Sequence, residues 1–69
     1  MPYQKLDDLP DSVKNHLPTH AQEIFRAAFN HAYEEYSNEE ERAFKVAWSA
    51  VKRDYEKGKD GNWHKKPEG

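Results

Sequence analysis

The stretch that decides the fold is residues 8–22, DLPDSVKNHLPTHAQ, in which a Leu-Pro pair occurs twice. Proline is favoured at the first position of a helix, because the backbone N–H that it lacks would have no partner there. Pro10 and Pro18 therefore each predict the start of a helix, and Pro18 also ends the helix before it. Leu9 and Leu17, which precede the prolines, are expected to turn inward and to hold the angle at which each helix begins.

Outward from this stretch, apolar residues recur at intervals of three and four, which is the spacing of one face of an α-helix. The pattern predicts three helices, over residues 10–16, 19–36 and 38–57. A turn of a few residues joins the two long helices, so they should lie antiparallel, with the short first helix closing the open side of the pair. Trp48, at the centre of the apolar stripe of the third helix, is the expected anchor of the core.

Polar residues mark the expected ends of the third helix. Ser37 with Glu40 can form a capping box at its start, in which each side chain accepts a hydrogen bond from the backbone N–H of the other residue. Asn38 with Glu41 offers the same box one residue further along. Gly58 is the candidate for the C-terminal cap, because glycine readily adopts the left-handed backbone found there.

The two ends of the chain are short and carry aromatic residues. Residues 59–62, KDGN, have the composition of a turn, and Trp63 after them is expected to pack back on the domain. Tyr3 gives the N-terminal end a similar character. We therefore predict that the two termini meet as a minor two-stranded pair, and that residues 65–69 form a frayed tail.

The composition bounds the fold and excludes several classes of protein. A chain of 69 residues is expected to form a single domain over residues 1–69, and it buries only about 60% of the surface that the unfolded chain exposes. The chain has no cysteine, which excludes disulfides and thiolate metal sites and is typical of a reducing compartment. It has neither an apolar run near the ~20 residues that span a bilayer nor the pattern of a signal peptide, so a cytoplasmic protein without membrane insertion is expected.

Several separated motifs are similar to those of one family. They are the paired Leu-Pro, His20-Ala21-Gln22, Ala28-Phe29-Asn30, Ala47-Trp48 with Val51-Lys52, and the closing Trp63. With these motifs the chain resembles the ChaB family of small proteins described as cation transport regulators, from MPY at its start to WHKK near its end. One departure lies in residues 37–42, which are short and acidic here, whereas other members can carry a longer polar insert.

The resemblance implies a fold and a function. It implies a compact, mainly helical domain, in agreement with the predicted array of three helices. It also implies regulation of a ChaA-type antiporter, which exchanges sodium, calcium or potassium ions for protons. On this basis we expect a small, non-enzymatic regulatory protein whose partner is a protein, namely the cytoplasmic face of such a cation antiporter.

Two regions of opposite charge are candidates for the working surface. Five glutamates lie within residues 34–41, and lysines gather towards the C-terminal end, so the layout is dipolar although the net charge is only −2. Polar members of the Leu-Pro stretch are also available to a partner. The candidate partner surface outside the acidic region comprises Lys14, His16, Gln22, Lys57, Lys59, Trp63, His64, Lys65 and Lys66.

Nucleic-acid binding through the C-terminal segment is the alternative function. An aromatic ring among lysines, as at Trp63, can stack on a base while the ammonium groups contact phosphates. The sequence pI of about 6.0 opposes this hypothesis, because nucleic-acid-binding domains usually have a basic excess. A protein partner is therefore preferred.

Catalytic and metal-binding patterns are weak. The serines lie in predicted helices or at a cap, and the sequence has no Gly-rich phosphate loop. His16 and His20 are spaced as metal ligands can be, but Pro18 between them places them off a common helix face. The sequence therefore predicts a protein that is not an enzyme and that has no cofactor and no metal site.

Overall fold

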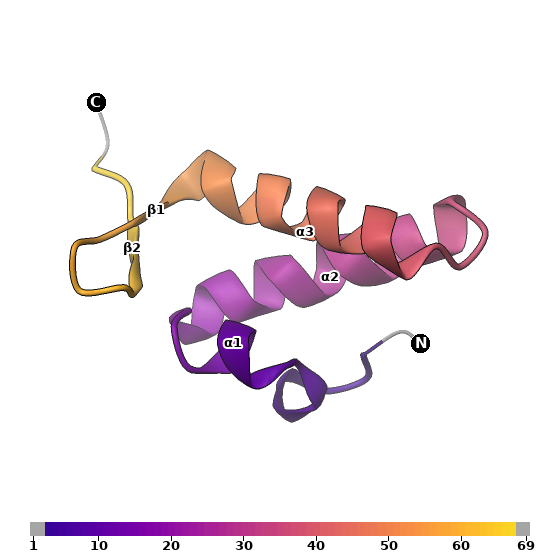
Figure 1. Ribbon diagram of the computed structural model, residues 1–69, viewed down its shortest axis with the longest axis horizontal. Coiled ribbons are helices and arrows are strands. Elements are labelled where there is room, and N and C mark those ends of the chain that lie inside the picture. Colours follow the sequence, from indigo (N-terminus) through magenta and orange to yellow (C-terminus); the bar gives the residue numbers. More distant parts are fainter. Residues whose placement is uncertain (1–2, 68–69) are drawn as a thin grey trace.

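Two antiparallel helices, α2 (Thr19–Glu35) and α3 (Glu40–Asp54), form the body of the molecule (Figure 1). The structure is a computed structural model that describes residues 3–67. A 3-10 turn, η1 (Leu6–Asp8), and a single-turn helix, α1 (Asp11–Lys14), lie against α2. Two short strands, β1 (Tyr55–Lys57) and β2 (Trp63–Lys65), follow α3 at the other end of the chain. The predicted three-helix, mainly α architecture is confirmed.

The two prolines lie just before the first helical position, and not at that position as expected. Pro10 and Pro18 are the N-caps of α1 and α2, with extended ψ values of 151° and 162°. Their carbonyl groups accept the first helical hydrogen bonds, from Lys14 and Gln22 respectively. The leucines before them are almost fully buried, as predicted, since Leu9 is 3% and Leu17 4% exposed.

The capping box predicted at the start of the third helix does not form in the turn between α2 and α3. Ser37 and Asn38 have φ values of 56° and 68°, and the Asn38 N–H donates to the Tyr33 carbonyl at 2.8 Å. A hydrogen bond from an N–H to the carbonyl five residues earlier, next to residues with left-handed backbone, is typical of the Schellman motif that ends a helix. These two residues therefore end α2, and the N-cap of α3 is Glu39, which makes no side-chain cap bond.

The small sheet forms between different segments from those expected. Its strands are β1 and β2, antiparallel, with Tyr55 opposite Lys65 and Lys57 opposite Trp63. The prediction that the two termini pair was wrong, because β2 pairs with β1 and not with the N-terminal segment. A hairpin is favoured because a short loop closes it, whereas joining the termini would order the whole chain between them.

The N-terminal segment docks on α2 instead of forming a strand. The Tyr3 N–H donates to Asn30 Oδ1 and Asn30 Nδ2 donates to the Tyr3 carbonyl, both at 2.8 Å. The Tyr3 ring also packs on Phe29, with 4.7 Å between centroids. One asparagine side chain thus satisfies both backbone groups of Tyr3, in the way that a neighbouring strand would.

The end of α3 and the start of the tail also differ from the prediction. α3 stops at Asp54 because Tyr55 turns to an extended conformation (φ −130°, ψ 155°) and enters β1, so Gly58 does not cap the helix. Lys65 belongs to β2, and the Lys66 N–H donates to the Asp54 carbonyl at 2.8 Å. The predicted fraying is therefore wrong for these two lysines, and residues 68–69 lie outside the described part.

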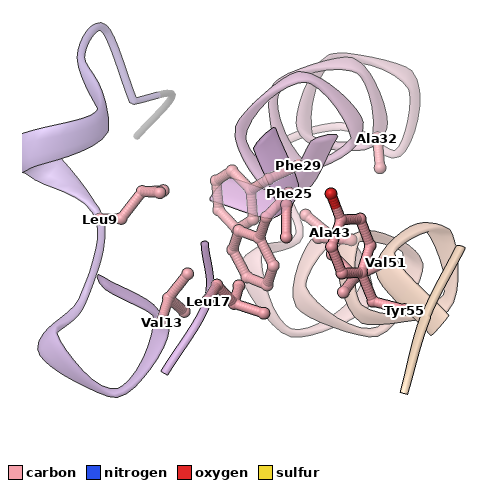
Figure 2. Close-up of a cluster of buried hydrophobic side chains, with 11 residues drawn as sticks. Leu9, Val13, Leu17, Phe25, Phe29, Ala32, Ala43, Val51 and Tyr55 are labelled. Atoms are coloured by element: carbon pink, nitrogen blue, oxygen red, sulfur yellow. The ribbon is translucent and has the colours of Figure 1, made fainter. Parts of the chain in front are cut away.

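The core lies where α2, α3 and the Leu-Pro stretch meet (Figure 2). Phe25 and Phe29 point from α2 towards the side chains of Leu9, Val13 and Leu17. Both phenylalanines are fully buried. The other buried residues are Ala21, Ala32, Ala43, Ala47, Val51 and Tyr55.

Trp48 is not the buried anchor that the sequence predicted. It packs against the core but remains partly exposed, and its ring makes a T-shaped contact with that of Phe25, with 5.1 Å between centroids and 74° between the ring planes. The buried residues of α3 are two alanines and a valine, so the fully buried aromatic rings, Phe25 and Phe29, come from α2.

Candidate functional site

The hairpin, the end of α1 and the C-terminal half of α3 meet at one corner of the molecule, which we call the hairpin corner. It comprises residues 15–18, 48–57 and 61–66. The Trp63 N–H donates to the His16 carbonyl at 2.8 Å. His16 Nδ1 lies 3.2 Å from Asn62 Oδ1. Two hydrogen bonds thus join segments that are far apart in the sequence.

An aromatic contact completes this corner. The Trp48 and Trp63 rings lie 5.4 Å apart between centroids, at an interplanar angle of 32°. Both side chains are partly buried, so the pair closes the edge of the core while leaving some ring surface accessible. Trp63 is therefore part of the packing, as the structural interpretation of its sequence position suggested.

Three open hollows surround the corner. The first, of about 540 Å³, lies between the second Leu-Pro joint and the hairpin and is lined by Asn15, His16, Leu17, Pro18, Tyr55, Asn62, Trp63, His64 and Lys65. The second, of about 470 Å³, is lined by Ser12, His16, Trp48, Lys52, Lys57, Gly61 and Trp63. The third, of about 380 Å³, is lined by His20, Arg53, Asp54, Tyr55, Lys65, Lys66 and Pro67. Most of the predicted partner surface is therefore gathered around one corner.

Two predicted surface residues are used for local structure. Gln22 Nε2 donates to the Leu17 carbonyl at 2.8 Å and to the Lys14 carbonyl at 3.3 Å. Lys14 Nζ donates to the Asp7 carbonyl at 3.0 Å. Both side chains are half-buried, and they satisfy backbone groups left open at the ends of short helical turns. Lys59 is exposed in the hairpin turn and lines none of the three hollows.

The hairpin turn contains a hydrogen-bonded carboxylate. Asp60 Oδ1 accepts from the Asn62 N–H at 3.0 Å and lies 3.2 Å from His64 Nε2. The backbone N–H of Asn62, and then the His64 side chain, lower the pKa of Asp60 below its ordinary value. Gly58 lies close to this pair, since a Cβ there would be 2.8 Å from His64 Cδ2 and 2.9 Å from Asp60 Oδ1, and these two side chains would have to shift to make room for it.

The acidic candidate surface lies at the opposite end of the α2–α3 pair, around the turn between these helices (Figure 1). A hollow of about 470 Å³ there is lined by Glu39, Glu40, Glu41, Arg42 and Lys45. The Arg42 guanidinium lies over the Tyr36 ring, 4.8 Å from its centroid. The two regions of opposite charge are therefore separated by the length of the long helices.

Metal-ligating side chains do not gather in the part of the chain that the structure describes. Between residues 3 and 67, no three histidine or carboxylate side chains converge to hold a metal ion. His16 and His64 instead contact Asn62 and Asp60 respectively. The histidines of the corner thus take part in the contacts that shape the hairpin.

None of the helices within residues 3–67 has the length and the apolar content that crossing a bilayer requires.

The family follows from comparison with known proteins. The ChaB family model matches residues 9–66. This chain belongs to the ChaB family. It is 51% identical to the Escherichia coli K12 protein named "Putative cation transport regulator ChaB", in an alignment that covers 96% of this chain and 99% of the relative. The Shigella flexneri protein of the same name matches with the same identity and coverage.

A solved structure of a ChaB protein supports the same fold. It is an NMR solution structure of a protein described as the "putative cation transport regulator ChaB", with 49% sequence identity and a TM-score of 0.86. The match covers 96% of this chain and the whole of that one. Both the resemblance inferred from the motifs and the mainly helical ChaB fold with a minor sheet are confirmed.

Sequence reasoning left Trp48 and Lys52 out of the candidate surface, although both line the second hollow of the ChaB hairpin corner. Trp48 was predicted to be the anchor of the core, and Lys52 was named only within a family motif. They are one helical turn apart, so they share a face, and this spacing is a signal available in the sequence. What places that face beside Trp63 is the hairpin, whose position depends on tertiary contacts.

Proposed function

We propose that this ChaB protein is a non-enzymatic regulator that binds the cytoplasmic face of a ChaA-type cation/proton antiporter. The observation that carries the proposal is the similarity, over nearly the full length of both chains, to proteins named as cation transport regulators. The antiporter as partner comes from the family resemblance, whereas the cytoplasmic location is the expectation drawn from the sequence composition.

The charge layout supports a role in binding. Exposed lysines at the hairpin corner and exposed glutamates at the opposite end provide two surfaces of different sign. Complementary charges steer association and fix the orientation of a partner. The two histidines of the corner serve local contacts, His16 with Asn62 and His64 with Asp60, which fits a recognition surface better than a reaction centre.

Transport measurements test this proposal. Cation-dependent proton movement would be compared in inverted membrane vesicles from cells that contain the antiporter, with and without the purified protein. We expect the protein to change the exchange rate. Equal rates, together with unchanged antiport in cells that lack the protein, would contradict the proposed function.

Charge-reversal variants then identify the working surface. Lys65→Glu with Lys66→Glu changes the hairpin corner, and Glu34→Lys with Glu35→Lys changes the opposite end, all four at exposed positions. If the hairpin corner is the working surface, we expect the lysine reversals to abolish the effect on transport and the glutamate reversals to preserve it. The opposite result would assign the acidic end.

Nucleic-acid binding is the alternative function. Lys57 lies opposite Trp63 in the sheet, and the partly exposed indole could stack on a base. The net charge of −2 opposes it. A salt-dependent mobility shift with labelled single strands, lost in Trp63→Ala with Lys65→Ala, would favour this alternative, whereas no shift at low salt would exclude it.

A further inference from the structure

The second hollow of the hairpin corner is an aromatic groove between α1, α3 and the hairpin. Trp48 and Trp63 both line it, with 5.4 Å between their ring centroids. Ser12 and His16 line it from the α1 side, and Gly61 lines it from the hairpin turn. Both indoles are partly exposed, so the groove offers apolar surface that the fold has left uncovered.

Each tryptophan of the groove has a lysine beside it. Lys52 lies one turn after Trp48 on α3, and side chains at this spacing share a helix face. Lys57 is the cross-strand partner of Trp63, and directly opposed residues of a sheet project from the same face. The helix α3 and the hairpin thus each contribute one tryptophan and one lysine to the lining of the groove.

The charge of the groove is one-sided. Its lining residues include Lys52 and Lys57, and none of the lining residues that the structure describes is a carboxylate. Glu56 is on the other face of β1, opposite His64, because successive strand residues alternate. Both lysines are exposed, and neither forms an ion pair with another residue between 3 and 67.

Hydrogen bonds join the two sides of the groove. The Trp63 N–H bond to the His16 carbonyl and the contact between His16 Nδ1 and Asn62 Oδ1 join its two walls. The helix and the hairpin that carry the lysines are regular elements. A preformed site loses less conformational freedom on binding, which favours recognition of a short segment.

From these features we propose that the groove binds an acidic peptide segment, with an apolar side chain of the segment on the two indoles and its carboxylates at Lys52 and Lys57. Charge complementarity identifies this occupant, since a short acidic segment needs few ammonium groups. A nucleic acid needs a longer basic track than the two lysines that line this groove. The proposal deepens the proposed function, on which it rests, by naming the surface and the chemistry of the partner.

Selection from a random library of short peptides tests the occupant. The purified full-length protein would be immobilised and the enriched peptides sequenced. We expect peptides that combine aspartate or glutamate with at least one aliphatic or aromatic residue. Enrichment of basic or uncharged peptides, or no enrichment at all, would overturn the proposal.

Intrinsic fluorescence locates the binding site. Trp48 and Trp63 are the only two tryptophans of the chain, so a selected peptide without tryptophan should change the emission on titration. Amide and indole N–H chemical shifts would be followed in parallel. We expect the changes to concentrate at the indoles and around residues 57–63. Changes centred on another face would show that the groove is not the site.

Charge-matched variants separate the groove from the general field of the protein. Lys52→Glu with Lys57→Glu should weaken binding of the selected acidic peptide about tenfold, because both charge contacts become repulsive. Lys45→Glu with Arg53→Glu makes the same net change at exposed positions outside the groove, and should alter the affinity by no more than about twofold. Equal losses in the two double variants would contradict a specific site.

Two further controls keep the outcome decisive. Circular dichroism checks the fold of each variant, and Lys52→Gln with Lys57→Gln, which should also weaken binding, replaces the reversal if that variant does not fold. A single-stranded oligonucleotide is titrated in parallel, and binding of the oligonucleotide in preference to the acidic peptides would replace the proposal with the nucleic-acid alternative. Because no transporter is present, peptide binding can succeed where the transport experiment fails, and the two results remain separable.

Discussion

Single side chains hold the short helical turns of this protein in place. Gln22 bonds the carbonyl groups of Leu17 and Lys14, and Asn30 bonds both backbone groups of Tyr3. Each of these polar residues is half-buried and reaches a segment that has few hydrogen bonds of its own. They supply partners to backbone groups that a turn as short as α1 leaves open.

Removal of the Gln22 amide should destabilise the joint between α1 and α2. Gln22→Ala is expected to lower the free energy of unfolding by about 1 kcal/mol, because two part-buried carbonyl groups lose a donor. Urea denaturation measures the change. Glu23→Ala, at the exposed next position, is the control and should have little effect. Equal stability of Gln22→Ala and the wild type would show that water replaces the amide without cost.

Tyr3 should make stability fall at alkaline pH. Burial, and then the negative charge of Glu40, raise the pKa of Tyr3 above the ordinary value of a tyrosine. A raised pKa in the folded state means that folding favours the neutral phenol. The contribution of Tyr3 to the free energy of unfolding is therefore complete below the ordinary pKa of tyrosine, and it is lost as pH rises through the folded-state pKa, above about pH 10.

The Tyr3→Phe variant isolates this effect. The difference between the urea midpoints of wild type and variant should change as pH rises above about 10, because only the wild type carries the Tyr3 hydroxyl. Lysines titrate in the same range in both proteins and cancel in the difference. A difference independent of pH would contradict the inferred environment of Tyr3.

At the scale of elements, the turns decide where helices and strands end. Ser37 and Asn38 adopt left-handed backbone and close α2, while Gly61, with φ of 85°, shapes the hairpin turn. Asparagine tolerates this region better than most residues, and glycine enters it without steric cost. The hairpin then carries Lys57, Trp63 and Lys65 to the corner where α1 ends.

The hairpin turn should loosen in acid through Asp60. Hydrogen bonds from Asn62 and His64 lower the pKa of Asp60, so the ionised form is favoured in the folded turn. This contribution is present above the ordinary pKa of aspartate and is lost as pH falls through the lowered folded value, below about pH 4. The protection factor of the Trp63 amide, which is the exchange rate of an unfolded chain at the same pH divided by that of the folded protein, should fall as the turn loosens.

Asp60→Asn is the matched variant for the turn. Its side-chain oxygen can still accept from the Asn62 N–H, but it does not titrate. We expect the acid-dependent step in amide exchange to be weaker or absent in this variant. The same acid-dependent step in both proteins would assign it to another carboxylate.

At the scale of the whole molecule, stability depends on a small aromatic core. The Cα radius of gyration is 11.9 Å, and the described residues bury no polar or charged side chain. Phe29 is fully buried, with Tyr3 at 4.7 Å and Phe44 at 4.9 Å between ring centroids. A domain of this size has a small stability margin, so one such ring is a large share of it.

Phe29→Ala should therefore cost more than Trp48→Ala. Loss of the Phe29 ring leaves a cavity lined by aromatic groups, with an expected cost of about 3–5 kcal/mol. Trp48 is partly exposed, and its removal mainly opens the edge of the core beside Trp63. Thermal and urea denaturation of the two variants give the order. A larger loss for Trp48→Ala would mean that the tryptophan pair, not the phenylalanines, holds the domain together.

The main architecture could be predicted because it depends on local rules. The helical spacing of apolar residues and the two prolines determine three helices and their buried faces, including Leu9 and Leu17. The ends were less predictable. Ser37 and Asn38 suit either the end of one helix or the start of the next, and the choice between them was made by the backbone that packing of α2 on α3 requires.

The candidate site could be predicted only in part, for a related reason. The lysines and Trp63 were recognisable from composition, but Gln22 was assigned to a surface although it bonds two carbonyl groups. Trp48 and Lys52 were left out because nothing in their own helix indicates that Trp63 lies beside them.

The sequence by itself determined the family, the helical class and the faces that form the core, since these follow from residue type and spacing along the chain. Only the tertiary structure decided that β1 pairs with β2 and not with the N-terminal segment, and that two tryptophan–lysine pairs share one groove. The physical reason is that these features join residues from different elements, and their free energy depends on distances that exist only once the chain has folded.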